Sequence, residues 1–149
     1  MRKLINTFII IFFFFICGNQ ESNSQEIEYI NSSESKKNDY PFSEATVVND
    51  IIYLSGQIGT LENGKLIDGG IKAETEQTML NIKSVLEKNG SSLEKVFKCT
   101  CMLADIKDWG EMSIEYKKFF TKNMPARSAF AGSGLALNAR VEIECWAVK

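Results

Sequence analysis

Hydrophobic periodicity changes along this chain between the spacing of a helix and that of a strand, and this constrains the fold. Residues 71–90 repeat apolar side chains every three or four positions, as one face of a helix does, and end at an Asn-Gly pair. Residues 96–103 repeat them at every second position, as a strand does. The predicted helix stripe contains Met79, Ile82, Val85 and Leu86, and the strand face contains Phe97, Cys99, Cys101 and Leu103. The chain therefore has to bury a helix against a sheet.

A second helix is predicted after residue 107. Asp108 and Glu111 have the spacing of an N-terminal cap and its reciprocal acid, and Pro125 marks the end of the helical pattern. Between them, apolar side chains recur at helical intervals at Trp109, Met112, Tyr116, Phe119 and Phe120. This stripe predicts that the second helix also packs on the sheet.

Shorter apolar runs predict the remaining strands. Two β-branched runs within residues 44–57 meet at Asn49-Asp50, which indicates a hairpin, and Asn63-Gly64 indicates a turn. Residues 31–41 are expected to form a polar loop. Further strands are predicted in residues 25–30, 126–131 and 139–148, the last two joined as a final hairpin.

The predicted elements follow one another as strands, helix, strand, helix and two strands. One sheet with both long helices packed on one face satisfies this order, so the predicted fold class is α+β. The 149 residues fit a single domain. The apolar sheet surface is larger than two helices can cover, which predicts a homotrimer.

The N-terminal segment has the pattern of a secretory signal. Two basic residues precede a short apolar run that ends at Cys17, and polar residues follow it. A helix over residues 4–17 would be only about 21 Å long, which is short of a hydrocarbon core of about 30 Å. We therefore predict a signal peptide over residues 1–24, cleavage before Gln25, an exported protein and a mature domain of residues 25–149. The alternative is a lipoprotein signal over residues 1–16, in which case a lipidated Cys17 would attach the protein to a membrane.

The composition excludes several kinds of active site. The chain has no histidine, which removes Ser/His and Cys/His nucleophile pairs and any zinc site that needs imidazole. Its three cysteines beyond the signal are Cys99, Cys101 and Cys145, whose spacing matches neither a redox motif nor a metal-ligand pair. Buried, unpaired thiols are the prediction for these cysteines, and no metal site is predicted.

The charge distribution argues against nucleic acid as a partner. The formal net charge is −2, and removal of residues 1–24 leaves a mildly acidic chain. Lysine pairs are scattered among acidic residues and form no basic stripe of the kind that phosphate backbones require.

Four motifs together resemble the Rid family, the reactive intermediate deaminases also called YjgF proteins. They are LSGQIG after a strand, MSIEYKKFF on a helix, MPARSAF, and LNARVEIECWAV near the C-terminus. The most specific feature is the arginine of PARS, followed fifteen residues later by the first glutamate of VEIE. The resemblance covers residues 27–149.

The resemblance implies a fold and an activity. Rid proteins have a chorismate-mutase-like α+β fold and form homotrimers, with active sites in clefts between subunits. They hydrolyse short-lived enamines and imines, such as 2-aminoacrylate, to 2-keto acids and ammonia, and they need no cofactor. An iminium carbon beside a carboxylate is already electrophilic, so water needs orientation and modest base assistance, and the lack of histidine is no obstacle.

The resemblance also assigns roles to individual residues. Arg127 matches the arginine that binds the substrate carboxylate, for which a two-pronged guanidinium is well suited. Glu142 matches the carboxylate that positions water, and Glu144 is expected on the same strand face. Ser55, Gly56 and Gln57 match the loop that lines the pocket, and the alternative for the glycine is a tight exit from the strand. A structural alternative for Arg127 is an ion pair with Glu142 or Glu144 across the final hairpin.

Several positions depart from the family pattern. Phe42, in YPFSEA, keeps an aromatic wall where GPYSQA is usual but lacks a phenol hydroxyl. Ser113 replaces a frequent asparagine, and Ala129 replaces a frequent cysteine. Arg140 is interpreted as a surface arginine at a strand end, or otherwise as a second cation near the site. These departures keep open a second function, a trimeric module that binds small carboxylates or presents hydrophobic surface to other proteins without turnover.

Overall fold

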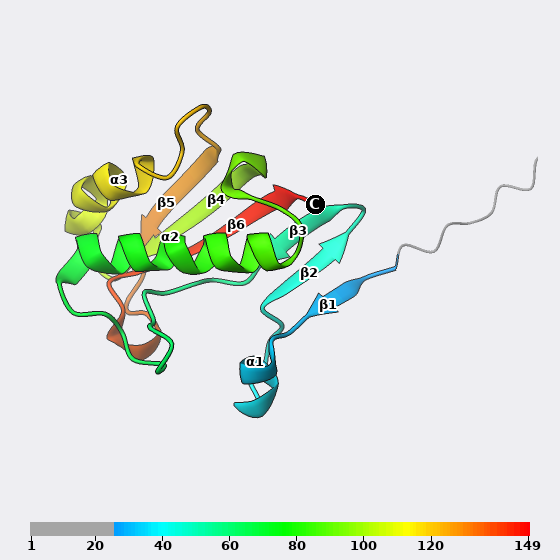
Figure 1. Ribbon diagram of the computed structural model, residues 1–149. Coiled ribbons are helices and arrows are strands. Elements are labelled where there is room, and N and C mark those ends of the chain that lie inside the picture. Colours follow the sequence, from blue (N-terminus) through cyan, green and yellow to red (C-terminus); the bar gives the residue numbers. More distant parts are fainter. Residues whose placement is uncertain (1–25) are drawn as a thin grey trace, which may run out of the picture.

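The computed structural model describes residues 26–149 and has one six-stranded sheet (Figure 1). The strand order across the sheet is β1-β2-β3-β6-β4-β5. The strands are β1 (Glu28–Ile30), β2 (Ala45–Val48), β3 (Ile51–Leu54), β4 (Val96–Leu103), β5 (Ala126–Ala131) and β6 (Val141–Val148). The helices are α1 (Ser33–Lys37), α2 (Gly70–Lys88) and α3 (Trp109–Lys117). The predicted signal peptide, Cys17 and the cleavage site before Gln25 lie outside the described residues.

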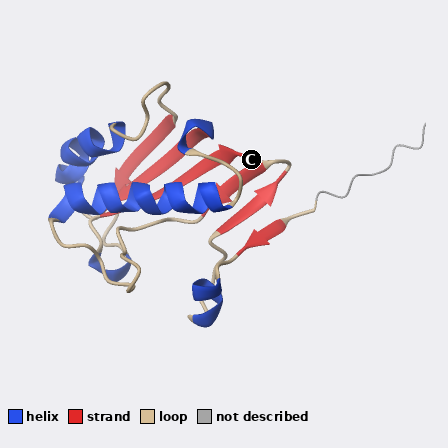
Figure 2. Cartoon of the chain, viewed as in Figure 1, coloured by secondary structure: helices blue, strands red, loops and turns tan. Residues whose placement is uncertain are grey.

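Both longer helices cover the same face of the sheet, which confirms the predicted α+β class (Figure 2). The sheet is mixed, because β4 and β5 are parallel while the other neighbours are antiparallel. The predicted stripe of α2 enters the core, with Met79, Ile82 and Leu86 fully buried. In the part of the chain that is described, no helix combines the length and the apolar character needed to cross a membrane.

The predicted final hairpin is wrong, because β4 lies between β5 and β6. β5 pairs in parallel with β4, and β6 pairs antiparallel with the other edge of β4. A parallel pair needs a crossover connection, and α3 provides it between β4 and β5. β4 is buried at alternate positions from Cys99 to Leu103 and occupies the interior of the sheet, whereas the largely exposed β5 takes the edge.

Two aromatic residues predicted to face the core do not. The register between β4 and β6 is irregular between Val96 and Lys98, so Val96 takes the inward position and Phe97 is 40% exposed. Trp109, at the start of α3, is 46% exposed although its helical spacing matches that of the buried Met112 and Tyr116. Periodicity alone predicted burial at both positions.

The local turn predictions hold. Asn49 and Asp50 both have a positive φ, 50° and 60°, and they join β2 to β3 in a tight hairpin. α2 ends as its Asn-Gly signal predicts: Gly90 has φ 79°, and the N–H of Ser91 donates to the carbonyl of Leu86.

The predicted polar loop of residues 31–41 is wrong in part, because it contains the short helix α1.

The predicted side-chain cap of α3 is absent. The Asp108 carboxylate instead accepts two hydrogen bonds from Arg140, from Nε at 2.9 Å and from Nη2 at 2.6 Å. This pairing uses the oxygens that would have capped the helix. Arg140 stands just before β6, and its side chain is half exposed, so the interpretation as a strand-end surface arginine is confirmed.

The cysteines are not all free, contrary to the prediction. Cys99 of β4 and Cys145 of β6 face each other across the antiparallel pair and form a disulfide with a Cα–Cα distance of 4.2 Å. Cys101 is free and buried. The spacing along the chain could not predict this bond, because it depends on β4 and β6 being neighbours in this register.

Candidate active site

Arg127 extends from β5 toward the face that the helices cover. It pairs with Cys99 of β4, whose buried side chain lies on that same face. Side chains alternate along β5, so Ala129 shares the face of Arg127, whereas Ser128 and Phe130 point to the other side. The edge position of β5 leaves Arg127 partly buried rather than enclosed.

The partners of the Arg127 guanidinium are all uncharged. Nη2 donates to Oγ of Ser113 at 3.0 Å, and Nη1 lies 3.9 Å from Sδ of Met112. The guanidinium carbon lies 5.4 Å from the centroid of the Trp109 ring and 5.1 Å from that of Tyr116. Within residues 26–149 Arg127 forms no salt bridge, so the alternative ion pair with Glu142 or Glu144 does not form.

Glu142 lies on the opposite face of the sheet. Val141, Ile143 and Cys145 of β6 are buried under the helices, and the alternation places Glu142 and Glu144 together on the other face, as predicted. Burial raises the pKa of the Glu142 carboxyl, and the nearby Glu144 charge raises it further. Both effects disfavour the ionised form, so this carboxyl holds a proton more readily than an exposed glutamate does.

The loop after β3 is fitted against Glu142. A Cβ atom added to Gly56 would lie 1.9 Å from Oε1 of Glu142, so this glycine provides the space for the carboxylate. Gln57 holds the loop to β6 through two backbone hydrogen bonds with Ile143, both 2.9 Å long. Oγ of Ser55 donates to the carbonyl of Ser43 at 2.7 Å, which ties the same loop to the segment that follows Phe42.

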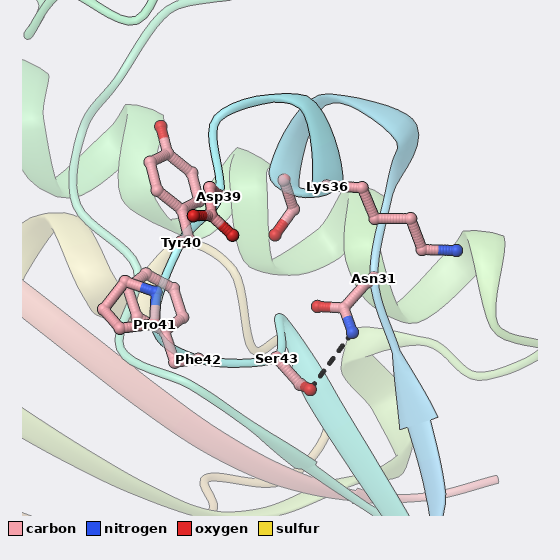
Figure 3. A pocket seen from close by; sticks show the side chains of 8 residues that line it. Asn31, Lys36, Asp39, Tyr40, Pro41, Phe42 and Ser43 are labelled. Carbon is pink, nitrogen blue, oxygen red and sulfur yellow. Dashed lines mark hydrogen bonds between the residues drawn. The ribbon is translucent and has the colours of Figure 1, made fainter.

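Phe42 stands at the edge of a separate surface cavity. Its ring is half exposed and stacks on the ring of Tyr40 with a centroid separation of 5.4 Å. The cavity has a volume of about 430 Å³, and Figure 3 shows the polar side chains of Asn31, Lys36, Asp39 and Ser43 around it. Nδ2 of Asn31 donates to Oγ of Ser43 at 3.2 Å.

The predicted site residues therefore form two groups on opposite faces of one sheet. The arginine half-site consists of Arg127, Ser113 and Ala129 with the rings of Trp109 and Tyr116. The glutamate half-site consists of Glu142, Ser55 and Gly56, with Phe42 on the segment to which Ser55 is bonded. A single chain does not bring Arg127 and Glu142 together.

Trp109 and Tyr116 were not predicted as site residues, because their helical spacing indicated core packing alone. The spacing did contain a signal. Trp109, Ser113 and Tyr116 lie at positions i, i+4 and i+7 and so share one side of α3. Once Ser113 is taken as a site residue, its neighbours one turn away on the same stripe become candidates as well.

In the part of the chain that is described, no three Cys, Asp or Glu side chains gather as ligands for a metal ion. The free Cys101 thiol does not offer a reactive thiolate either, because burial raises its pKa to about 11. The chemistry available at the two half-sites is that of a guanidinium, a carboxyl group, hydroxyls and backbone groups.

Comparison with known proteins identifies the family of this chain. The family model described as Endoribonuclease L-PSP matches residues 34–149. The chain belongs to the Rid (YjgF) family. Human 2-iminobutanoate/2-iminopropanoate deaminase is 38% identical over 110 residues, which cover 73% of this chain and 80% of that protein. Protein HMF1 of Saccharomyces cerevisiae is 42% identical over 108 residues, which cover 72% of this chain and 84% of that protein.

The fold of this Rid protein also matches solved structures of the family. A crystal structure from Yersinia pestis, described as a protein of unknown function of the conserved Rid protein family, superposes with a TM-score of 0.77. It is 31% identical in sequence and covers 83% of this chain and 100% of its own. The single sheet with helices on one face is therefore the Rid arrangement.

Proposed function

We propose that this Rid protein hydrolyses small 2-imino acids and their enamine tautomers, such as 2-aminoacrylate, to 2-keto acids and ammonia. The observation that carries the proposal is the Arg127 guanidinium, which is partly buried and has no acidic partner among residues 26–149. The name of the human relative, a 2-iminobutanoate/2-iminopropanoate deaminase, supports the same substrate class.

In this proposal Arg127 binds the substrate carboxylate through two parallel hydrogen bonds and so fixes the position of the iminium carbon. Ionised Glu142 accepts a proton from water as the water oxygen forms a bond to that carbon. Glu142 then gives this proton to the nitrogen of the resulting carbinolamine. As the C–N bond breaks and ammonia leaves, the carbinolamine hydroxyl gives its proton to the Glu142 carboxylate and becomes the carbonyl. Glu142 passes this last proton to the departing ammonia, which leaves as ammonium. The raised pKa of Glu142 suits a group that both accepts and returns a proton.

We further propose that the protein is a homotrimer in which the arginine half-site of one subunit faces the glutamate half-site of the next. The position of the two half-sites on opposite faces of the sheet supports a site completed by a second copy. The face opposite the helices also carries exposed aromatic side chains: Trp146 is 38% exposed and Phe97 40%, and the Trp146 ring packs against Tyr53 at 5.1 Å. Contact between copies would cover this apolar surface.

The main experiment measures ammonia and pyruvate formed from 2-aminoacrylate that a pyridoxal-phosphate dehydratase releases in the assay. Spontaneous hydrolysis, measured without the protein, is the baseline. We expect the wild-type protein to accelerate hydrolysis well above it, and Arg127→Ala to lose most of this acceleration. A wild-type rate equal to the baseline would contradict the deaminase proposal.

One feature favours a second candidate, a trimer that binds small carboxylates without turnover. Phe42 provides no hydroxyl where the family usually has a phenol, so any step that needs that hydroxyl is lost. Carboxylate binding by Arg127 without accelerated hydrolysis would support this module instead.

We also propose that the protein is exported. The Cys99–Cys145 disulfide supports an oxidising compartment, where such bonds persist, and the N-terminal signal pattern points the same way. Mass spectrometry of the exported protein should find Gln25 at the N-terminus. A diacylated Cys17 would instead establish the lipoprotein alternative, and an uncut chain in the cytoplasm would contradict export.

A further inference from the structure

We propose that Trp109 and Tyr116 are positioning residues, which hold the Arg127 guanidinium in place for a small carboxylate without neutralising its charge. The inference rests on the proposed function, because it takes Arg127 as the group that binds the carboxylate. It names the residues that hold the guanidinium in place, and it explains why the charge of the guanidinium is not neutralised by a neighbouring acid.

The geometry places the cation against two ring faces. Trp109 and Tyr116 lie about two turns apart on α3, and their ring centroids lie 5.4 and 5.1 Å from the Arg127 guanidinium carbon. A cation within about 6 Å of an aromatic face is attracted by the ring quadrupole. Ser113, between the two rings on the same side of α3, accepts one N–H of Nη2 at 3.0 Å. Several of the five guanidinium N–H groups therefore stay free of partners within residues 26–149.

Arg140 provides a contrast within the same chain, because its charge is neutralised by an acidic side chain. Its Nε and Nη2 donate to the Asp108 carboxylate at 2.9 and 2.6 Å, so its forked edge is already filled by an anion. A second carboxylate would have to displace Asp108. Aromatic faces attract the Arg127 cation but accept no strong hydrogen bond from its edge, and the hydroxyl of Ser113 is uncharged, so a ligand carboxylate meets no anionic competitor there.

The two rings differ in exposure, and this makes the inference testable. Tyr116 is 2% exposed and contacts the Arg127 guanidinium from the core side, whereas Trp109 is 46% exposed and contacts it from the solvent side. Replacement of Trp109 therefore leaves the core intact. The buried Tyr116 hydroxyl has no hydrogen-bond partner among residues 26–149, so its ring, rather than its hydroxyl, is the part that contacts Arg127.

The test is the affinity of the full chain for 2-oxobutanoate, a 2-keto acid of the size expected for the product, measured by calorimetry. We expect Trp109→Leu to weaken binding about threefold to tenfold and Trp109→Phe, which keeps an aromatic face, to stay within about twofold of wild type. Ile114→Ala, an exposed change on the same helix, is the control and should have no effect.

Two further readouts separate positioning from general damage to the fold. In the deaminase assay Trp109→Leu should raise KM with little change in kcat, because the guanidinium is misplaced but still charged. Binding of 2-oxobutanoate should change the tryptophan fluorescence of the wild type, and this change should vanish in Trp109→Phe. Melting temperature and light scattering should be unchanged in every Trp109 variant.

Wild-type affinity in Trp109→Leu would overturn the inference, and so would equal weakening by leucine and phenylalanine at that position. Failure of the proposed function is distinguishable. A wild-type protein that binds 2-oxobutanoate with the expected variant pattern but does not accelerate hydrolysis supports the inference and contradicts deaminase activity. A wild-type protein that binds no 2-oxobutanoate would overturn the inference, whereas deaminase activity is decided by the hydrolysis rate alone.

Discussion

At the scale of single residues, the contrast between two arginines carries the functional argument. Arg140 is bound by the Asp108 carboxylate, and Arg127 is bound by a hydroxyl, a thioether and two rings. Arg127 lies in β5 and Arg140 stands just before β6, and of these two arginines only Arg127 has no acidic partner among residues 26–149. Residue type alone did not separate them, because the acidic partner of Arg140 comes from 32 positions earlier in the chain.

The first prediction separates charge from geometry at Arg127. Lysine keeps the positive charge but loses the two-pronged donor, so Arg127→Lys should behave nearly like Arg127→Ala. We expect kcat/KM on 2-aminoacrylate to fall about tenfold to a hundredfold in both variants, because a hydrogen bond to a charged group is lost. Melting temperatures should change little. A lysine variant as active as wild type, or an alanine variant that does not fold, would make Arg127 a structural residue.

The second prediction uses the raised pKa of Glu142. Activity should increase with pH as the Glu142 carboxyl ionises, with a midpoint above the usual range of a glutamate, and Glu142→Gln should lower kcat about a hundredfold or more. The contribution of Glu142 to folding stability changes with pH in the opposite direction to activity. A raised folded-state pKa means that the neutral form is favoured on folding, so this contribution is present at low pH and is lost as pH rises through the folded-state pKa.

Glu142→Gln stays neutral and so keeps that contribution at every pH. The melting temperature of the glutamine variant relative to wild type should therefore increase as pH rises from below the usual glutamate pKa to above the raised one. A difference that shrank with rising pH would contradict the assigned direction of the shift.

At the scale of elements, the loop after β3 and the strand β6 act as one unit. The backbone bridge between Gln57 and Ile143 holds them together, and Gly56 leaves the volume that the Glu142 carboxylate occupies. Gly56 does not have a φ in the left-handed region, so its backbone conformation does not require glycine. Glycine is required here because the Glu142 side chain lies where a Cβ atom would be. The glutamate half-site is thus built by the contact of two elements that are far apart in the sequence.

The third prediction follows from this contact. Gly56→Ala would place a Cβ 1.9 Å from Oε1 of Glu142, so the carboxylate must move and kcat should fall at least tenfold. Gly110→Ala is the matched control. A Cβ at Gly110 of α3 meets nothing within 4 Å, and alanine should stabilise the helix by about 0.5–1 kcal/mol without loss of activity. Equal activity in both variants would show that the fit of Gly56 against Glu142 is not needed for turnover.

The fourth prediction concerns the bond between the central strands. The Cys99–Cys145 disulfide joins cysteines with a sequence separation of 46, and its loss should lower the free energy of unfolding by about 2–4 kcal/mol. Denaturation of the wild type with and without reductant, and of Cys99→Ala/Cys145→Ala, measures this change. Reductant should act slowly on the folded protein, because both cysteines are buried. If reductant left the unfolding curve unchanged, the bond would not be present in solution.

At the scale of the whole molecule, the fifth prediction is that the active species is a homotrimer. Arg127 and Glu142 lie on opposite faces of the sheet, so one chain does not hold a complete site. Light scattering should give three times the mass of one chain. Mixing an Arg127→Ala subunit with a Glu142→Gln subunit and allowing exchange should restore some activity, because a mixed interface can pair an intact half-site from each. A stable, active monomer would contradict the shared site.

The sequence by itself determined the features that depend on neighbours along the chain. α2 ends at Lys88, just before Asn89-Gly90, where glycine readily adopts positive φ. The Asn49-Asp50 hairpin forms because Asn and Asp tolerate positive φ better than most other side chains. Alternation placed Glu142 and Glu144 on one strand face, and the spacing of PARS and VEIE identified the family.

Only the tertiary structure decided which segments became neighbours. Periodicity states which side chains share a face but not which strands pair, so the position of β4 between β5 and β6 was not predictable from it. The Cys99–Cys145 bond, the exposure of Phe97 at an irregular register, the pairing of Asp108 with Arg140 and the rings around Arg127 all follow from that arrangement. Each depends on long-range packing, whose free energy outweighs the local preference of any one of these residues.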